Sequence, residues 1–148
     1  RPRRSTDFPD TTLFRSTIAA VKAALEAAAL TTYYGTVPGT PTYPYVLLWS
    51  SAGSPPIEDS VATVGDFEDT LGVTSVALMG EAVLRTQEMA RAALASFASG
   101  SAAVTGRITW LNLYESRPVD MDQRVTLTGG THPGFGVDLY RLRSTRAA

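Results

Sequence analysis

The chain has 148 residues, of which 44% are hydrophobic and 18% charged, and its formal net charge is −1. This length suits one domain with a hydrophobic core of its own. The chain has no cysteine and a single histidine, His132, which excludes disulfides, thiolate zinc sites and multi-histidine metal sites. No apolar run approaches the roughly 18 residues that span a bilayer, so we expect no membrane partner.

The charges are segregated along the chain. Arginines gather near both ends, whereas acids gather in the middle, and Lys22 is the only lysine. The arginine and alanine bias indicates a GC-rich genome, and residues 1–9 are interpreted as a flexible basic arm. A nucleic-acid-binding module using these arginines is disfavoured, because no helix face is basic and the net charge is slightly negative.

The N-terminal half predicts one helix and two strands. Apolar residues spaced four, three and four apart predict a helix over Thr11–Ala29. Strands are predicted over Thr31–Val37 and Tyr45–Ser50, and the second is apolar on both faces, which is typical of a central strand. Tyr43 and Tyr45 flank a proline; they form either an aromatic ligand platform or, as we favour, a cover for the end of the sheet.

Ser51–Asp69 is a long connection rich in acids and proline. Loops of this length in a compact domain are usually functional or disordered. Three interpretations stay open: a divalent-metal site, a solvated loop, or a docking arm, which we favour. We predict that Ile57 to Asp69 leaves the domain body and contacts a partner, with Phe67 as an apolar anchor in a charged rim. The candidate interface residues are Ile57, Glu58, Asp59, Asp66, Phe67, Glu68 and Asp69.

A strand over Thr70–Leu78 and an amphipathic helix over Gly80–Phe97 are predicted next. The inward helix face should consist of Val83, Ala90, Leu94 and Phe97. The outer face carries helix-spaced pairs of glutamate and arginine, including Glu88 with Arg91. We expect this charged face to solvate the helix and to contribute little stability.

The last third predicts three more strands. Arg107–Glu115 is apolar on both faces, so it should be covered on both sides, and Trp49 and Trp110 should be largely buried. Short and final strands are predicted over Arg124–Leu127 and Gly136–Arg143. The loop between the first two holds opposite charges that form either an intra-loop salt-bridge network, which we favour, or a subunit contact; these residues are Arg117, Asp120, Asp122 and Arg124.

Together these elements predict one α+β domain over residues 1–148. A mixed sheet of about four to six strands should be packed by two α-helices. Glycines around the Gly129–Gly136 corner lack the pattern of a phosphate-binding loop and are interpreted as turn residues. We expect no catalysis, no cofactor and no structural metal. The enzyme alternatives are a hydrolase using His132 and a metal-dependent nuclease using the acidic loop, although the only lysine lies on the first helix.

Several segments resemble the tail terminator proteins of long-tailed bacteriophages, especially those of high-GC hosts. They are the alanine-rich helix near residue 12, the strands at Tyr43–Trp49 and Asp69–Val76, and the closing Val137–Tyr140. The resemblance covers most of the chain. It implies a tail-terminator-like fold and a homo-hexameric ring that caps the tail tube, ends tail polymerisation and joins the tail to the head.

The same resemblance implies the partners and the location. They would be copies of this chain, the major tail tube protein and a head–tail connector or stopper protein, with genomic DNA passing through the lumen without sequence-specific binding. The protein would be assembled in the host cytoplasm and reside in the neck of the virion. The acidic loop would touch a neighbouring subunit or the tube, or line the DNA channel. The alternative functions are another neck protein, such as a connector or stopper, or a metal-dependent nuclease.

Overall fold

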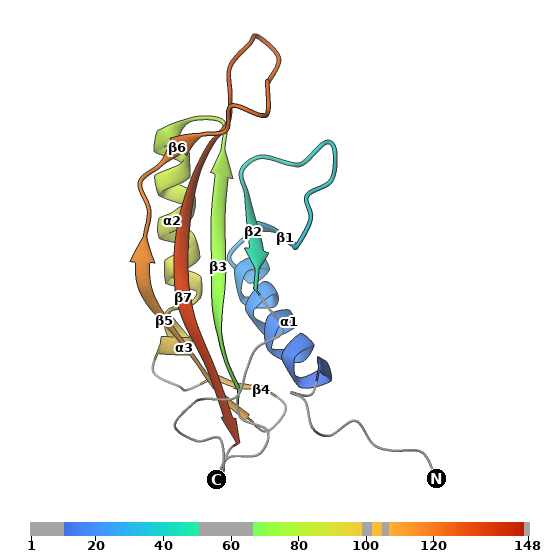
Figure 1. Cartoon of the computed structure of the whole chain (residues 1–148), viewed down its shortest axis with the longest axis vertical. Helices are drawn as coiled ribbons and strands as arrows, with labels where there is room; N and C mark the ends of the chain where they lie inside the picture. The colour runs from blue at the N-terminus through green and yellow to red at the C-terminus, as the bar shows by residue number, and fades with distance from the viewer. Residues whose placement is uncertain (1–10, 51–66, 99–101, 105–106, 147–148) are drawn as a thin grey trace, which may run out of the picture.

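The computed structural model describes residues 11–50, 67–98, 102–104 and 107–146, and it confirms a mixed α+β fold (Figure 1). The helices and strands, in chain order, are α1 (Thr11–Ala27), β1 (Thr31–Tyr34), β2 (Tyr45–Trp49), β3 (Phe67–Ala77), α2 (Gly80–Ala93), α3 (Ala95–Ala98), β4 (Ala102–Val104), β5 (Arg107–Ser116), β6 (Asp120–Met121) and β7 (Gly134–Arg146).

In the described residues, all seven strands join one sheet in the order β1-β2-β3-β7-β5-β4, and β6 adds to β7. The centre is formed by β3 and β7, which pair antiparallel from Phe67↔Ser144 to Ala77↔Gly134. All neighbouring strands are antiparallel except β1 and β2, which are parallel. β2 is therefore an inner strand, as predicted, but it lies next to the edge strand β1.

Both long helices pack on the same face of the sheet, behind the strands in the view of Figure 1. Alternate residues of each strand point to this face. The buried core therefore joins strand residues to residues of α1, of α2, of α3 and of the position between α2 and α3. The strand residues are Val46, Leu48, Leu71, Val73, Leu111 and Leu142, and the others are Ile18, Val21 and Leu25 of α1, Ala90 of α2, Leu94 between α2 and α3, and Phe97 of α3. The predicted inward face of the second helix is confirmed, because Val83, Ala90, Leu94 and Phe97 are all buried.

Two glycines let α2 approach β7 closely. A β-carbon at Gly136 would lie 2.6 Å from Nε2 of Gln87, and one at Gly134 would lie 3.1 Å from a methyl group of Val83. The interpretation of these two as turn glycines is wrong, since both belong to β7. It is right for Gly129 and Gly130, whose φ angles of 98° and 85° place them in the left-handed region.

The predicted strand over Arg124–Leu127 is absent, and a turn takes its place. Asp122 Oδ1 accepts a hydrogen bond from the Arg124 N–H, and the Leu127 N–H donates to the Thr131 carbonyl. The two-residue strand β6 forms just before this turn instead. β5 is also not covered on both sides along its length, because Leu113 and Tyr114 are 40% and 48% exposed.

The burial of Tyr140 in this core predicts that stability depends on pH in alkaline solution. Burial, with a smaller contribution from the nearby Asp138 charge, raises the pKa of Tyr140 to about 12. Between pH 10 and about 12 the unfolded chain releases a phenol proton that the folded chain keeps, so the free energy of unfolding falls as the pH rises. At pH 11.5 we expect Tyr140 to account for a loss of about 2 kcal/mol.

Urea unfolding at pH 9 and pH 11.5 measures this loss directly. Tyr140→Phe should show a loss smaller by about that amount, whereas Tyr114→Phe, at an exposed tyrosine, should lose as much as the natural chain. Equal losses in all three proteins would contradict the assignment to Tyr140.

Candidate interface on the helix-free sheet face

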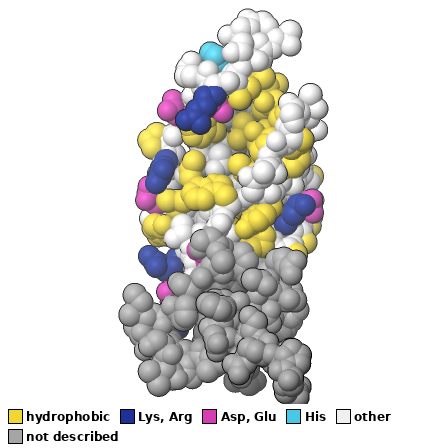
Figure 2. Space-filling model, turned by 45° about the vertical axis from the view of Figure 1, so that its right-hand side comes forward, with side chains coloured by type: hydrophobic (Ala, Val, Ile, Leu, Met, Phe, Trp, Pro, Cys, Tyr) yellow, Lys and Arg dark blue, Asp and Glu magenta, His cyan; other side chains and the backbone are white. Residues whose placement is uncertain are grey.

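The sheet face opposite the helices is the main candidate site. No helix of the described residues covers it, yet its strands present large apolar side chains. Tyr45, Leu47 and Trp49 of β2 share this face, by register, with Val76 of β3 and Phe135, Val137 and Leu139 of β7. Trp49 is exposed and Leu47, Phe135 and Val137 are partly exposed, whereas Tyr45, Val76 and Leu139 are buried. Figure 2 shows hydrophobic side chains exposed in several adjoining areas of the surface. An exposed apolar area of this kind is typical of a protein interaction site.

Trp49 lies flat on this face. A β-carbon at Gly72 would fall 2.0 Å from the indole ring, so the ring occupies the space that a side chain would need. The indole N–H donates to Thr74 Oγ1 at 2.9 Å, and the residue is 39% exposed. The prediction that both indoles are largely buried is therefore wrong for Trp49, because no second layer of the described residues covers it, and Trp110 is only partly buried.

A groove of about 730 Å³ opens at one end of this face. One wall comes from the segment after β1, with Pro38, Pro41 and Tyr43, and the other from Met121 of β6 and Val125 of the turn that follows it. Leu47, Val76 and Phe135 contribute to its lining. The groove thus has a mainly apolar lining contributed by elements far apart in the sequence, with Asp122, Gln123 and Arg124 as polar lining residues.

The tyrosines beside this groove hold its first wall in place. Tyr45 packs against Tyr33 and Tyr43 with ring centroids 5.4 Å apart in both pairs. The Thr42 N–H donates to the Tyr33 hydroxyl at 3.3 Å, and burial raises the pKa of Tyr45. This arrangement agrees with the favoured interpretation of tyrosines covering the end of the sheet, while Tyr43 and Tyr45 also line the groove.

Charged residues of β7 lie beside the apolar area, next to β5 and β3. The Arg141 guanidinium lies 5.3 Å from the ring centroid of Tyr114, within the range of a cation–π contact. Arg143 Nε lies 4.0 Å from Glu68 Oε2. An apolar centre with a polar margin is the usual composition of a protein interface.

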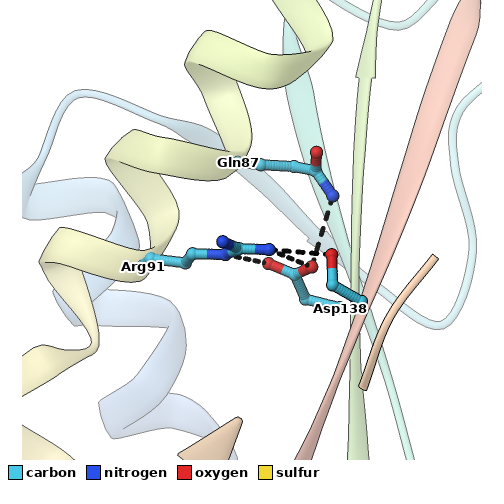
Figure 3. Close-up of polar contacts among 4 residues, drawn as sticks. Gln87, Arg91 and Asp138 are labelled. Carbon is cyan, nitrogen blue, oxygen red and sulfur yellow. Dashed lines mark hydrogen bonds and ion pairs between the residues drawn. The ribbon is translucent and has the colours of Figure 1, made fainter. Parts of the chain in front are cut away.

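A second polar feature joins α2 to β7 on the other side of the sheet. Asp138 is only 1% exposed, and its carboxylate accepts hydrogen bonds from Arg91 Nε at 2.7 Å and Arg91 Nη2 at 2.9 Å (Figure 3). Gln87 Nε2 donates to the same carboxylate at 3.3 Å, and Arg91 Nη2 also donates to Ser116 Oγ at 2.8 Å. The hydrogen bond to Asp138 raises the pKa of Arg91.

This cluster is not predicted from the sequence, whose helical spacing places Arg91 in an ion pair with Glu88 on the outer face of α2. The arginine turns instead to the buried Asp138, because an unpaired buried carboxylate costs far more than a lost surface pair. The available signal was an acid, Asp138, placed between the apolar residues Val137 and Leu139 of a predicted strand. A groove of about 530 Å³ between α2 and residues 116–119 lies beside the cluster.

The predicted acidic docking loop is only partly described. Ile57, Glu58, Asp59 and Asp66 lie outside the described residues. Phe67, Glu68 and Asp69 do not leave the domain body, because they begin β3 and pair with Ser144, Arg143 and Leu142. The assignment of Phe67 to a loop is wrong, since the antiparallel pairing with β7 continues through it.

The loop after β5 does not contain the favoured salt-bridge network. Arg117 Nε pairs with Glu115 Oε2 at 2.8 Å, and this acid belongs to β5. The carboxylates of Asp120 and Asp122 accept backbone N–H groups of Met121 and Arg124. Short acids in a tight turn satisfy their own backbone more readily than distant side chains. Arg117, Asp120, Asp122 and Arg124 are all exposed or partly exposed, so a subunit contact stays a prediction.

His132 supports the same turn. Its Nδ1 lies 2.6 Å from the carbonyl oxygen of Val125. In the part of the chain that the structure describes, no group of three or more His, Asp or Glu residues could hold a metal ion. None of the helices among these residues is long and apolar enough to cross a membrane.

Comparisons with known proteins add no assignment. No family model matches the chain, and no curated protein matches it.

Proposed function

We propose that this protein is a structural subunit of a bacteriophage tail, and that it forms a homo-hexameric ring that caps the tail tube, ends its polymerisation and joins it to the head-side connector. Besides the resemblance of its segments to tail terminators, the observation that supports the proposal is the helix-free sheet face. Large apolar side chains on this face, with Trp49 39% exposed, favour a surface that becomes covered on assembly.

The arrangement of one helix layer on one face of the sheet is compatible with a ring subunit. One face of the sheet is committed to the internal core with α1 and α2, which leaves the other face for contacts with further protein. Its groove of about 730 Å³ is open to an inserted side chain or loop of a tail tube subunit. Anchors that fill such pockets dominate the binding energy of interfaces.

The mass of the purified assembly tests the ring, and tail tubes test its role. We expect native mass spectrometry to give six copies, and electron microscopy to show density at one end of tail tubes only after the protein is added. A monomer both with and without tubes would contradict the proposal. A ring that leaves tubes uncapped but binds a head-side connector would instead support another neck protein.

A further inference from the structure

Two edges of the sheet have no strand beside them within the described residues. One is β1, which pairs only with β2. The other is the part of β5 after Thr109, because β4 pairs with β5 only from Arg107 to Thr109. Alternate residues of an edge strand direct their N–H and C=O groups outward, so Trp110–Ser116 and β1 both present a row of backbone donors and acceptors.

Neither β1 nor the segment Trp110–Tyr114 carries the charges or prolines that usually prevent pairing, and the charge of Glu115 lies beyond this segment. β1 reads Thr-Thr-Tyr-Tyr, and the first five residues of the free β5 edge read Trp-Leu-Asn-Leu-Tyr. Large side chains beside both edges are exposed, namely Tyr34 at 42%, Leu113 at 40% and Tyr114 at 48%. A register shift between Leu113 and Glu115, followed by Pro118, ends the regular part of the β5 edge. The segment available for pairing is therefore centred on Trp110–Leu113.

The directions of the two edge strands fit one another. Three antiparallel pairings, β2 with β3, β3 with β7 and β7 with β5, lie between β2 and β5, so these two strands run in opposite directions. β1 is parallel to β2 and therefore antiparallel to β5. A neighbouring copy generated by rotation about an axis along the strands keeps these directions. Its β1 then meets β5 in the antiparallel sense, in a heterologous contact of the kind that closes into a ring.

The register sets where the contact falls. Tyr34 is level with Ser116 across the sheet, through Leu48, Val73 and Asp138. A contact with Trp110–Leu113 therefore requires the neighbouring β1 to be displaced along β5 toward Trp110, which a strand tilt of the matching sense against the ring axis provides.

We propose that β1 of one copy adds to the free edge of β5 of the next, so that a continuous β-sheet runs around the ring. The inference rests on the proposed ring and identifies its subunit contact. The occupant is a second copy of this chain because one such contact covers both uncharged edges. A two-fold β5-to-β5 contact would cover β5 and leave β1 open in each copy.

Because the natural chain has no cysteine, cross-linking tests the contact cleanly. Tyr34 and Leu113 are exposed and point to the same side of the sheet. Within one copy their strands are four spacings apart, roughly 19 Å, so a short bismaleimide joins them only between copies. The double variant Tyr34→Cys/Leu113→Cys should give a covalent ladder that ends at the ring size.

Mixing the two single variants should give covalent dimers, whereas each alone should give none. Dimers from Leu113→Cys alone would overturn the inference in favour of a two-fold contact. A ring by mass with no cross-linked product from the double variant would also overturn it, while leaving the proposed ring function intact.

A charge placed on the edge provides a second readout. Leu113→Lys should raise the concentration at which half of the rings dissociate by at least tenfold, because the charge must be buried beside a neighbouring strand. Met89→Lys, at a similar exposed fraction of 38% on α2, should leave it unchanged. Equal effects of the two variants, with folding verified by circular dichroism, would contradict the edge contact.

Discussion

Replacing Arg91 with alanine should lower the free energy of unfolding by about 2 to 3 kcal/mol, less than for a fully buried ion pair because the Arg91 side chain is 43% exposed. The substitution leaves the Asp138 carboxylate, which is 1% exposed, with only Gln87 Nε2 at 3.3 Å as a side-chain donor among the described residues. An uncompensated buried carboxylate is among the costliest defects in a folded protein. Urea unfolding at neutral pH, followed by circular dichroism, measures the change.

Two further variants separate the buried pair from general effects on the helix. Arg85→Ala, at an exposed arginine on α2, should change stability by no more than about 0.5 kcal/mol. The double variant Arg91→Met/Asp138→Leu removes both charges together and should recover most of the loss, because apolar side chains of similar size often replace a buried ion pair without cost. Equal losses for Arg91→Ala and Arg85→Ala would show that the ion pair does not hold α2 on the sheet.

Two adjacent leucines of β2 should respond very differently to the same substitution. Leu48→Ala removes a side chain that is fully buried between the sheet and the helices, and should cost about 3 kcal/mol of unfolding free energy. Leu47→Ala acts on the helix-free face, where the side chain is only partly buried, and should cost about 1 kcal/mol. Urea unfolding of both variants under conditions that keep the chain monomeric measures the difference.

Assembly should show the opposite order for the same pair. Leu47 lines the groove on the helix-free face, so Leu47→Ala should weaken tail-tube capping, whereas any folded Leu48→Ala protein should cap normally. Capping is counted from tube ends in electron micrographs. If Leu47→Ala cost as much stability as Leu48→Ala and capped normally, the helix-free face would be part of the internal core.

The sequence by itself determined the kinds of elements and most of their positions. The spacing of Ile18, Val21 and Leu25 is enough to predict α1, and that of Val83, Ala90 and Leu94 is enough to predict the inward face of α2. These predictions hold because helix periodicity is local and separates a buried stripe from a solvated one. The α+β fold class followed from the order of such elements.

The tertiary structure alone decided what lies against each strand face. The sequence of a strand that is apolar on both sides, such as β2, does not show whether one or two layers of the protein cover it. The exposure of Trp49 could therefore not be predicted from the sequence of β2. The pairing of Phe67–Asp69 with β7 and of Arg91 with Asp138 likewise depends on residues 47 or more positions away. Non-local contacts of this kind are set by the packing of whole helices and strands, and short stretches of the sequence do not reveal that packing.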